Sequence, residues 1–498
     1  MLITRKSTWA ATLIGGWLLL SAFSHARADR FTDDAEKLHD KYAADLEQVA
    51  KTCERLGMAE QARQTRSTLK AQDPYKLYVP ILPDETGVDD LPENAPDLVE
   101  KWHSQYWKIR RTHAKEMYRL AQRAVSHRPS LACTLAIRAI HAYPDHEGLR
   151  RLFGHQKYHD KETGITRWHT AFEVNQFKNR MVWHEKFGWV REAHVEKLEG
   201  GQRRHNGRWI TAEADARIHR DIRQGWIVET EHYQIRTNHS IEGAVALGEK
   251  LEQLHHIWRR MFFRYYASQA QVIALFNGRA QAQSRRPQRF RIDYFRNRED
   301  YVKALKPIMP NIGISVGVYM EGTRTAYFFA GEDPDDRTLY HEATHQLFHQ
   351  SRRVANTVGR NANFWIVEGI AVYMESLHRE KGYWVLGGLD DDRMYAARFR
   401  LLNDKFHIPL AELSTYGMEK MQADPRIATI YSEMAGLTNF LVYYEGGRYR
   451  DAMVAFLSAV YDGNNDPNLF ADLAGVSYSE LDKQYREFME AASQAAGQ

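Results

Sequence analysis

The sequence predicts an α+β fold preceded by a mainly α-helical N-terminal region. Helical periodicity runs through residues 29–150, strand-like segments gather between residues 226 and 330, and helical segments continue to the C-terminus. A run of strands followed by a run of helices is typical of α+β proteins, and 498 residues suffice for two or three domains. We therefore divide the mature chain into a helical domain at 29–150, a small β-containing module at 151–225 and a third domain at 226–498.

Residues 1–28 have the pattern of a signal peptide. Arg5 and Lys6 precede a largely apolar run over residues 8–23, and the sequence A-R-A at 26–28 offers a cleavage site. The apolar run is short for a membrane span, so we expect an exported protein, periplasmic or extracellular, with no stable membrane span after cleavage. Cleavage lowers the formal net charge from +4 to about +1. Such a near-neutral chain has no overall signature of nucleic-acid binding.

The helical domain divides into two blocks. Residues 31–71 have the pattern of a helical hairpin with a break at Gly57, and residues 97–143 form a second helical block. Five prolines between residues 72 and 96 indicate a linker. We interpret the domain as packed helices, and a role in binding a protein partner stays open.

The only two cysteines, Cys53 and Cys133, fall in this helical domain. In an oxidising compartment they can pair, and the sequence leaves a disulfide and two free thiols equally open. Neither cysteine lies near the histidine motif described below, which argues against a nucleophilic role.

Glycine and tryptophan punctuate the module at 151–225. Trp168, Trp189 and Trp209 each stand beside turn-forming and β-branched residues, a pattern that predicts small β-hairpins. A carbohydrate-stacking role for these tryptophans is an alternative, and hairpin packing is the favoured interpretation.

Strand and helix patterns alternate in the first part of the third domain. We expect strands at 226–237, 271–276, 312–319 and 325–330. Between the first two we expect a long amphipathic helix, whose buried stripe comprises Leu247, Leu251, Leu254, Ile257, Trp258 and Met261. An Arg-rich segment at 279–298 is interpreted as a solvated loop, with a polyanion site as the alternative.

The rest of the third domain is predicted to be helical. A helix is expected at 299–305, after the Arg-rich segment. Beyond residue 375 we expect only helices, at 391–402, 427–444, 450–461 and 478–492. We expect these helices to pack together as a helical lobe.

A candidate metal centre begins with the motif H-E-x-x-H at His341, Glu342 and His345. Residues four apart lie one turn above each other on a helix, so both imidazoles can reach one ion. Glu342 sits one position round the helix, where its carboxylate can touch a water rather than the ion. Leu339 and Leu347 belong to the predicted core face of the same helix.

Capping residues mark the starts of two helices at this centre. Asp333 is the expected N-cap of the first, followed by Pro334 at the first helical position and by Asp335 and Asp336 at the positive end of the dipole. Asn363 is expected to cap the second.

The second helix supplies a third candidate ligand, Glu368. The small residues Gly369 and Ala371 are expected to let this helix approach the H-E-x-x-H helix closely. Glu375 shares the face of Glu368 and is a candidate to orient a histidine, with solvent exposure as the alternative. Two histidines, one carboxylate and an open fourth position describe a catalytic zinc (Zn2+) site.

The two motifs, H-E-A-T-H at 341–345 and W-I-V-E-G-I-A-V-Y-M-E at 365–375, resemble the gluzincin metallopeptidases. The resemblance is to the peptidase MA-like domains of exported bacterial proteins in particular. The second motif is also similar to the W-L-x-E-G-F-A segment of the aminopeptidase N family. The resemblance extends over about residues 226–492 and implies a gluzincin-like metallopeptidase fold with a mixed sheet lobe and a helical lobe.

Residue by residue, this resemblance implies that His341, His345 and Glu368 bind zinc and that Glu342 is the general base. Metzincins are disfavoured, because their pattern needs histidine at position 351, where this chain has serine. The acid that thermolysin-like enzymes carry four residues after the third ligand is missing, since that position is a valine. The segment G-V-Y-M-E at 317–321 matches the aminopeptidase N substrate strand imperfectly, so no aminopeptidase assignment follows.

Two further side chains have open roles at this centre. Hydrolysis also needs an oxyanion donor. Tyr431 is our candidate, because similar domains have a tyrosine at such a helix start; Tyr416 competes, and core packing is the alternative role. His349 extends the histidine stripe by one turn and is interpreted as structural, with a role at the metal as the alternative.

These observations predict an exported zinc-dependent hydrolase. We expect a metallopeptidase that cleaves a peptide or protein substrate with a zinc-activated water and Glu342 as general base. The alternatives are a non-catalytic, zinc-stabilised scaffold or binding protein, and a zinc amidase acting on a non-peptide or cell-wall amide. Glu342 contributes nothing to metal ligation, which argues against the scaffold. The substrate, endo- versus exopeptidase cleavage and the oligomeric state stay open.

Overall fold

A computed structural model of the protein describes residues 30–69, 72–85, 91, 94–279, 289–331 and 336–496. Across these residues the fold is mixed α+β, as the sequence predicts. The predicted signal peptide lies outside the described residues, as do Asp333, Pro334 and Asp335 of the predicted helix cap. Within the described ranges, no helix combines the length and the apolar character needed to cross a membrane.

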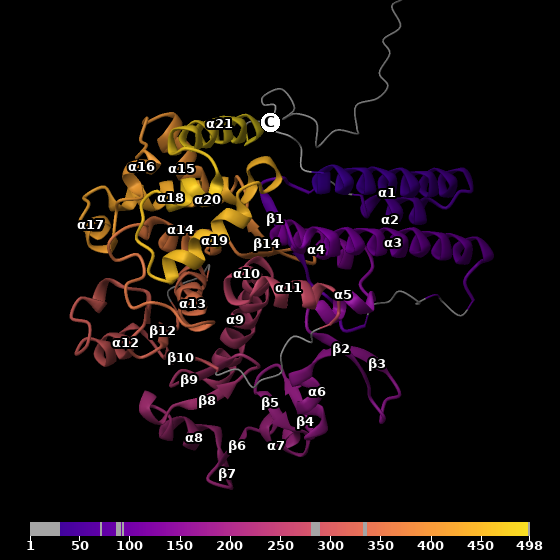
Figure 1. The fold of residues 1–498 in the computed structure, drawn as a ribbon. Coiled ribbons are helices and arrows are strands. Elements are labelled where there is room, and N and C mark those ends of the chain that lie inside the picture. The colour runs from indigo at the N-terminus through magenta and orange to yellow at the C-terminus, as the bar shows by residue number, and fades with distance from the viewer. Residues whose placement is uncertain are drawn as a thin grey trace, which may run out of the picture.

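Long helices form the N-terminal part of the chain, on the right in Figure 1. They are α1 (Arg30–Arg55), α2 (Ala59–Ser67), α3 (Asp97–Ala124), α4 (Pro129–Ala142) and the short α5 (Glu147–Leu152). The break between α1 and α2 falls at Gly57, whose positive φ of 75° suits glycine. Both predicted helical blocks are therefore confirmed. Cys53 and Cys133 are buried here as free thiols, which decides between the two open alternatives.

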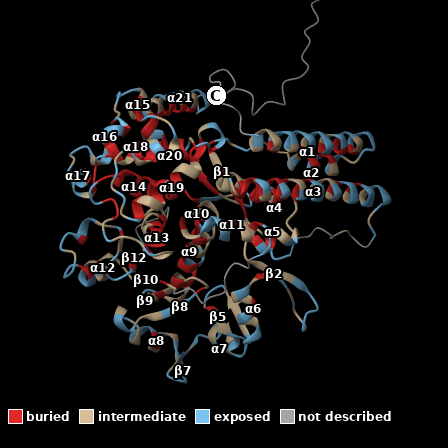
Figure 2. Cartoon of the chain, viewed as in Figure 1, coloured by how far each residue is buried: buried red, intermediate tan, exposed pale blue. Residues whose placement is uncertain are grey.

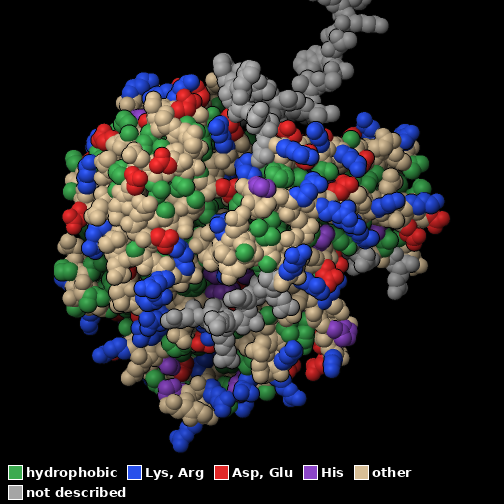
Figure 3. Space-filling model, viewed as in Figure 1, with side chains coloured by type: hydrophobic (Ala, Val, Ile, Leu, Met, Phe, Trp, Pro, Cys, Tyr) green, Lys and Arg blue, Asp and Glu red, His purple; other side chains and the backbone are tan. Residues whose placement is uncertain are grey.

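Charged side chains of both signs cover these helices. Figure 3 shows Lys and Arg interspersed with Asp and Glu on the visible face of α1 to α3. Arg66, for example, pairs with both Glu47 and Glu54, with 2.9 Å between Arg66 Nη2 and Glu47 Oε1. Exposed pairs of this kind contribute little to stability and leave a mixed, solvated surface.

The proline-rich segment predicted to be a linker contains a strand. β1 (Lys76–Pro80) pairs antiparallel with β14 (Tyr383–Gly387), and β14 pairs with β13 (His378–Glu380). The prediction that only helices follow residue 375 is also wrong, because β13 and β14 form a hairpin there. The alternation of buried Leu77 and Val79 in β1 is the local signal for this strand. A three-stranded sheet thus joins segments that lie about 300 residues apart in the chain.

The module between the helices and the main sheet consists of three hairpin–helix units. The first has β2 (His155–His159), β3 (Thr166–Thr170) and α6 (Ala171–Lys178). The second has β4 (Met181–His184), β5 (Gly188–Arg191), η1 (Glu192–His194) and α7 (Val195–Glu199). The third has β6 (Gln202–His205), β7 (Arg208–Thr211) and α8 (Ala212–Ile218). The prediction of small hairpins is confirmed, and in Figure 1 the units follow one another from the lower right to the bottom.

Tryptophans connect these units. Trp189 packs edge-on against Phe177 of the preceding α6, with 5.6 Å between ring centroids, and Trp209 packs against His194 of the preceding η1 at 5.2 Å. Trp226, just after the third unit, donates its indole N–H to Asp215 of α8. Each of these tryptophans therefore packs on the helical segment before it, which agrees with the packing interpretation.

A five-stranded sheet follows, in the order β11-β12-β10-β9-β8. Its strands are β8 (Trp226–Glu229), β9 (Tyr233–Thr237), β10 (Phe290–Phe295), β11 (Gly317–Met320) and β12 (Thr325–Phe329). β10 runs parallel to β9 and β12, whereas the edge strands β8 and β11 are antiparallel to their neighbours. The connecting helices are α9 (Ile241–Met261), α10 (Phe263–Tyr266), α11 (Gln269–Phe276), α12 (Arg298–Leu305) and the 3₁₀ helix η3 (Ile312–Ile314). The stripe of α9 is buried as predicted, with Met261 only partly covered.

Several local predictions in this part are wrong. Residues 271–276 belong to α11 rather than to a strand, because a short apolar run fits either structure and the capping box of Ser268 and Gln271 starts a helix. The predicted strand at 226–237 is two strands, β8 and β9, joined by a turn. The one at 312–319 begins with η3 and becomes extended only at Gly317.

The central strand β10 lies inside the Arg-rich segment that was interpreted as a loop. Its charged residues are used within the fold: Asp293 accepts a bidentate pair of hydrogen bonds from Arg236 on β9. Arg289 and Arg296 likewise pair with acidic residues, in β8 and α12 respectively. Because β10 carries charged residues, it lacks the simple alternation of apolar and polar residues that would have predicted a strand. Arg285 and Arg286 lie outside the described residues.

The C-terminal lobe is built around α14. Its helices are α13 (Arg337–Gln350), α14 (Phe364–Met374), α15 (Asp392–Leu402), α16 (Leu410–Leu413), α17 (Met418–Gln422), α18 (Ile427–Tyr443), η4 (Tyr444–Gly446), α19 (Arg450–Tyr461), α20 (Leu469–Ala474) and α21 (Tyr478–Ala496). The four helices predicted after residue 375 correspond to α15, α18, α19 and α21. All 11 residues of α14 are buried, and Figure 2 shows buried residues concentrated in α14, α18 and α19. α14 is therefore a rigid support for any side chain it presents.

Candidate metal centre

The H-E-x-x-H helix, α13, begins later than predicted. Asp336 is its N-cap, with a left-handed φ of 57° and no side-chain cap, so Asp336 does not lie in the first turn. The Asp336 carboxylate pairs instead with Lys250 of α9, at 2.7 Å between Oδ2 and Nζ. Leu339 and Leu347 are buried as predicted, and their face of α13 fixes the direction of the histidine face.

The helix carrying Glu368, α14, also differs in its start. Asn363 is the N-cap, but its side chain donates to the carbonyl of Asp466 at 2.8 Å and caps no helical N–H. Gly369 does allow a close approach, but to α18: a Cβ atom there would lie 2.6 Å from Thr438 Oγ1. The predicted role of this glycine beside α13 is therefore wrong.

The structure brings His341, His345 and Glu368 together. The Nε2 atoms of the two histidines lie 3.2 Å apart, and they lie 3.5 Å and 3.6 Å from the two carboxylate oxygens of Glu368. One ligand atom from each of the three residues falls within 4.8 Å of the others. Each histidine side chain keeps 14% of its surface exposed and Glu368 keeps 10%, so the group is reachable from solvent.

Glu375 determines which nitrogen of His341 faces the group. Its Oε1 lies 2.9 Å from His341 Nδ1, and its Oε2 accepts from Arg393 Nε at 3.2 Å. Because Nδ1 donates to a carboxylate, the neutral ring presents a lone pair at Nε2. Glu375 is buried at 7% exposure, which rules out the alternative of a solvent-exposed residue.

This arrangement fits a divalent cation. The two imidazole Nε2 atoms and the Glu368 carboxylate converge, and when both Nε2 atoms are unprotonated these acceptors repel unless a positive charge lies between them. The pKa values of these side chains also indicate that a positive charge is favoured between them. Burial lowers the pKa of His341, but hydrogen bonds to Glu368 and Glu375 raise it overall well above its usual value. Burial raises the pKa of Glu368, but His345, His341 and Tyr431 bring it down to about 2.

Glu342 stands beside the three residues without joining them. Its Oε2 accepts a hydrogen bond of 2.7 Å from the backbone N–H of Tyr319 on the edge strand β11. Burial, with the nearby charges of Glu368 and Glu375, raises the pKa of Glu342 to about 7, against the opposing effect of His341. A carboxylate with a pKa near neutrality is suited to take and return a proton.

Tyr431 contacts the group from α18. Its hydroxyl donates to Glu368 Oε2 at 2.9 Å, and burial followed by the charge of Glu368 raises its pKa above the usual value. The competing Tyr416 instead donates to Glu412 at 2.9 Å. Of the two tyrosines, only Tyr431 is thus placed to act at this group.

His349 lies one turn beyond His345 and outside the converging atoms. Its Nε2 is 3.3 Å from Glu321 Oε1, and its ring packs on Tyr461 with 5.2 Å between centroids. Burial lowers the pKa of His349 to about 4. These contacts favour the structural interpretation over metal ligation.

Sequence reasoning missed two contributors. Arg393, near the start of α15, holds Glu375, and the Tyr319 amide holds Glu342. An arginine in a helix and a backbone N–H in a strand carry no local signal for either role.

Neither a protein-family model nor a curated protein matches this chain.

Proposed function

We propose that the protein is an exported zinc-dependent metallopeptidase, with a gluzincin-like domain formed by the five-stranded sheet and the C-terminal helices. The observation that supports this most directly is the convergence of His341, His345 and Glu368 beside a fourth group, Glu342, that is held away from the ligand position. A purely structural metal site has no use for a buried base at its edge. Export is proposed on the sequence pattern of residues 1–28.

The bound metal would supply Lewis acidity at an open coordination position, which activates water and polarises a carbonyl. The residues of the chain do the rest. Glu342, oriented by the Tyr319 amide, takes the proton of the attacking water and later gives it to the leaving nitrogen. The Tyr431 hydroxyl keeps its proton because of its raised pKa and can donate to the oxyanion that develops on the carbonyl.

Peptide substrates are favoured by the position of β11. This strand is the edge of the five-stranded sheet, and its Tyr319 amide faces Glu342. An extended chain that adds to a sheet edge forms backbone hydrogen bonds of the kind any peptide can make. A peptide aligned along β11 would pass the candidate metal centre, which supports a peptidase over an amidase.

The test is hydrolysis of a peptide library by the zinc-loaded full chain. Glu342→Gln keeps the size of the side chain but removes the base, so activity is expected to fall about 10²–10⁴-fold while zinc content is retained. Glu419→Gln, an exposed acid on α17, is the matched control. Full activity in Glu342→Gln contradicts the assigned mechanism.

Two other outcomes would identify the alternatives. If chelation lowers the melting temperature but neither peptides nor unfolded proteins are cut, the centre is structural. If only non-peptide amides are hydrolysed, the protein is an amidase with the same site.

A further inference from the structure

The three hairpin–helix units share a pattern at the turn into the helix. In the second and third units the first strand ends in an equivalent histidine, His184 and His205, each paired with the residue before the tryptophan, whereas the first unit has Tyr158 at that position. The residue that caps each helical segment is Thr170, Arg191 and Thr211, and a tryptophan stands two residues before each of them. The units are therefore structural repeats, and equivalent positions can be compared within one chain.

The third unit differs from the other two at two equivalent positions. Four residues after the cap, the first two units have Val174 and Val195, whereas the third has Asp215. Eight residues after the cap, the third unit has His219, where the second has Glu199. An acid thus replaces an apolar residue at a position that is 97% buried, since Asp215 is only 3% exposed. Burying a carboxylate in place of a valine is costly unless a cation accompanies it.

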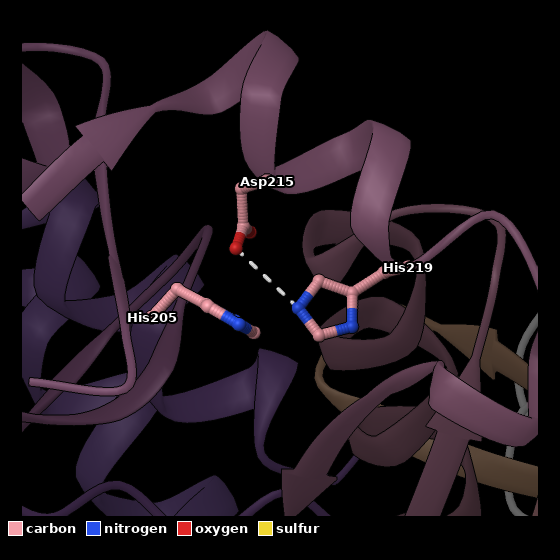
Figure 4. A group of neighbouring side chains, drawn as sticks. All are labelled: His205, Asp215 and His219. Atoms are coloured by element: carbon pink, nitrogen blue, oxygen red, sulfur yellow. Dashed lines mark ion pairs between the residues drawn. The ribbon is translucent and has the colours of Figure 1, made fainter. Parts of the chain in front are cut away.

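These changes create a cluster of His205, Asp215 and His219, shown in Figure 4. One ligand atom of each residue lies within 4.8 Å of the others. Asp215 Oδ1 is 3.3 Å from His219 Nε2, and the rings of the two histidines are 5.7 Å apart between centroids. The figure shows the three side chains pointing toward a common space: His205 from the end of β6, Asp215 from α8 and His219 from the residue that follows α8.

The surrounding contacts leave the cluster without an obvious positive charge. His219 Nδ1 contacts the carbonyl of Gln224, to which only an N–H can donate, so the neutral ring turns an Nε2 lone pair toward Asp215. The other carboxylate oxygen of Asp215 accepts from Trp226 Nε1 at 2.7 Å. Within the part of the chain that the structure describes, no Lys or Arg pairs with Asp215. In the neutral form of His219, a lone pair and a carboxylate therefore face each other.

The second unit shows what the same position does without the acid. There, His184 Nε2 lies 3.3 Å from Glu199 Oε1, an ordinary partly exposed histidine–carboxylate contact. In the third unit a second histidine replaces that glutamate, and a buried carboxylate is added between the rings. Two imidazoles and one carboxylate held by outer hydrogen bonds are the donor set and the supporting contacts of a zinc-class metal site.

We infer that His205, Asp215 and His219 bind a second divalent metal ion of the zinc class, separate from the candidate metal centre of α13 and α14. Gln224 and Trp226 orient two of the ligands, and both stand at the junction with β8. The bound ion thus ties the last hairpin–helix unit to the edge of the five-stranded sheet. This inference does not depend on the proposed peptidase activity.

Among the described residues, a further histidine–carboxylate cluster outside the candidate metal centre comprises His232, Glu252 and His255, and it is different. The Glu252 carboxylate already accepts from the Thr230 hydroxyl and the His232 amide, each at 2.6 Å, and lies 2.7 Å from His232 Nδ1. Its hydrogen-bonding capacity is satisfied by neighbouring protein groups. The rings of His232 and His255 lie tilted against each other, with 3.8 Å between centroids. Glu252 and His232 are explained as a packed hydrogen-bond group, whereas His255 Nδ1 has no hydrogen-bond partner among the described residues.

The experiment measures bound zinc per chain for the full-length protein without a histidine tag, equilibrated with zinc and then dialysed. The wild type is expected to hold two ions. Asp215→Val, which restores the residue type of the other two units, is expected to hold one and to stay folded. His345→Ala is expected to hold one, and the combination with Asp215→Val none. With cobalt in place of zinc, the visible spectrum of each single variant should show one of two distinct components.

Controls make the result decisive. His184→Ala removes the equivalent histidine of the second unit and should leave two ions bound. If Asp215→Val fails to fold, His219→Gln provides the same test with a polar side chain. A wild type that holds one ion, lost in His345→Ala, overturns the second site but leaves the proposed peptidase centre standing. Two ions retained in both Asp215→Val and His219→Gln also overturn it, and Asp215 and His219 are then an ion pair only.

Discussion

The Glu375 carboxylate holds His341 in one tautomer: Oε1 lies 2.9 Å from Nδ1, and Arg393 holds the other oxygen at 3.2 Å. Glu375 follows Glu368 by seven residues, which is about two helical turns. It is the C-cap residue of α14. Four residues after Glu368, this chain has the buried Val372, so the carboxylate that contacts His341 comes from further along the chain.

Replacing Glu375 by glutamine is expected to weaken zinc binding about 10–100-fold, because the histidine loses the carboxylate that fixes its ring and raises its basicity. Competition with a chromophoric chelator measures the change. Glu419→Gln, an exposed acid on α17, serves as the control. Unchanged affinity in Glu375→Gln would show that α13 alone positions His341.

Tyr431→Phe is expected to lower kcat/KM for peptide hydrolysis about 10²-fold, since one donor to the oxyanion is removed. Steady-state kinetics and zinc analysis are needed together. Tyr416→Phe is the matched control, because that hydroxyl contacts Glu412 rather than the metal ligands. If Tyr431→Phe loses zinc in proportion to activity, the tyrosine acts by positioning Glu368 and not on the substrate.

Gly369→Ala is expected to destabilise the protein by about 2 kcal/mol. The added Cβ would lie 2.6 Å from Thr438 Oγ1 and 3.2 Å from the Met434 carbonyl, and both atoms belong to α18. Denaturant unfolding of metal-free protein measures this cost. Gly313→Ala provides the comparison, because its Cβ meets no atom within 4 Å. Equal stability of the two variants would mean that α18 can move away.

His407 is expected to make stability depend on pH. Burial lowers its pKa, but the adjacent Asp482 and Glu433 carboxylates raise it overall to about 9 from the usual 6.5. The folded state therefore keeps a proton that the unfolded chain releases between these values. The contribution is complete below about pH 6.5 and is lost as the pH rises through about 9.

Comparison of wild type with His407→Gln tests this dependence. The difference in unfolding free energy between the two proteins should shrink by about 3 kcal/mol from pH 6 to pH 10. His159→Gln, at an exposed strand end, is the control for loss of a histidine. A difference that stays constant with pH would show that His407 is not protonated in the folded protein.

Patterns of short range were read correctly from the sequence. The break at Gly57, the buried stripe of α9 and the three hairpins each depend on residues a few positions apart. Where a short pattern fitted two structures, as at residues 271–276, the prediction was wrong. β10 was missed because its charges are neutralised by a partner strand, Arg236 with Asp293, that no local pattern reveals.

The sequence by itself determined that His341 and His345 share one helical face and that Glu342 stands beside them, because a helix of 3.6 residues per turn allows no other arrangement. Only the tertiary structure decided that Glu368 meets both histidines, that Glu375 turns toward His341 and that Tyr431 reaches Glu368. The same holds for His205, Asp215 and His219. These side-chain contacts depend on how α14, α18 and the third hairpin–helix unit pack. Packing is a sum of many long-range contacts, and spacing along the chain does not encode it.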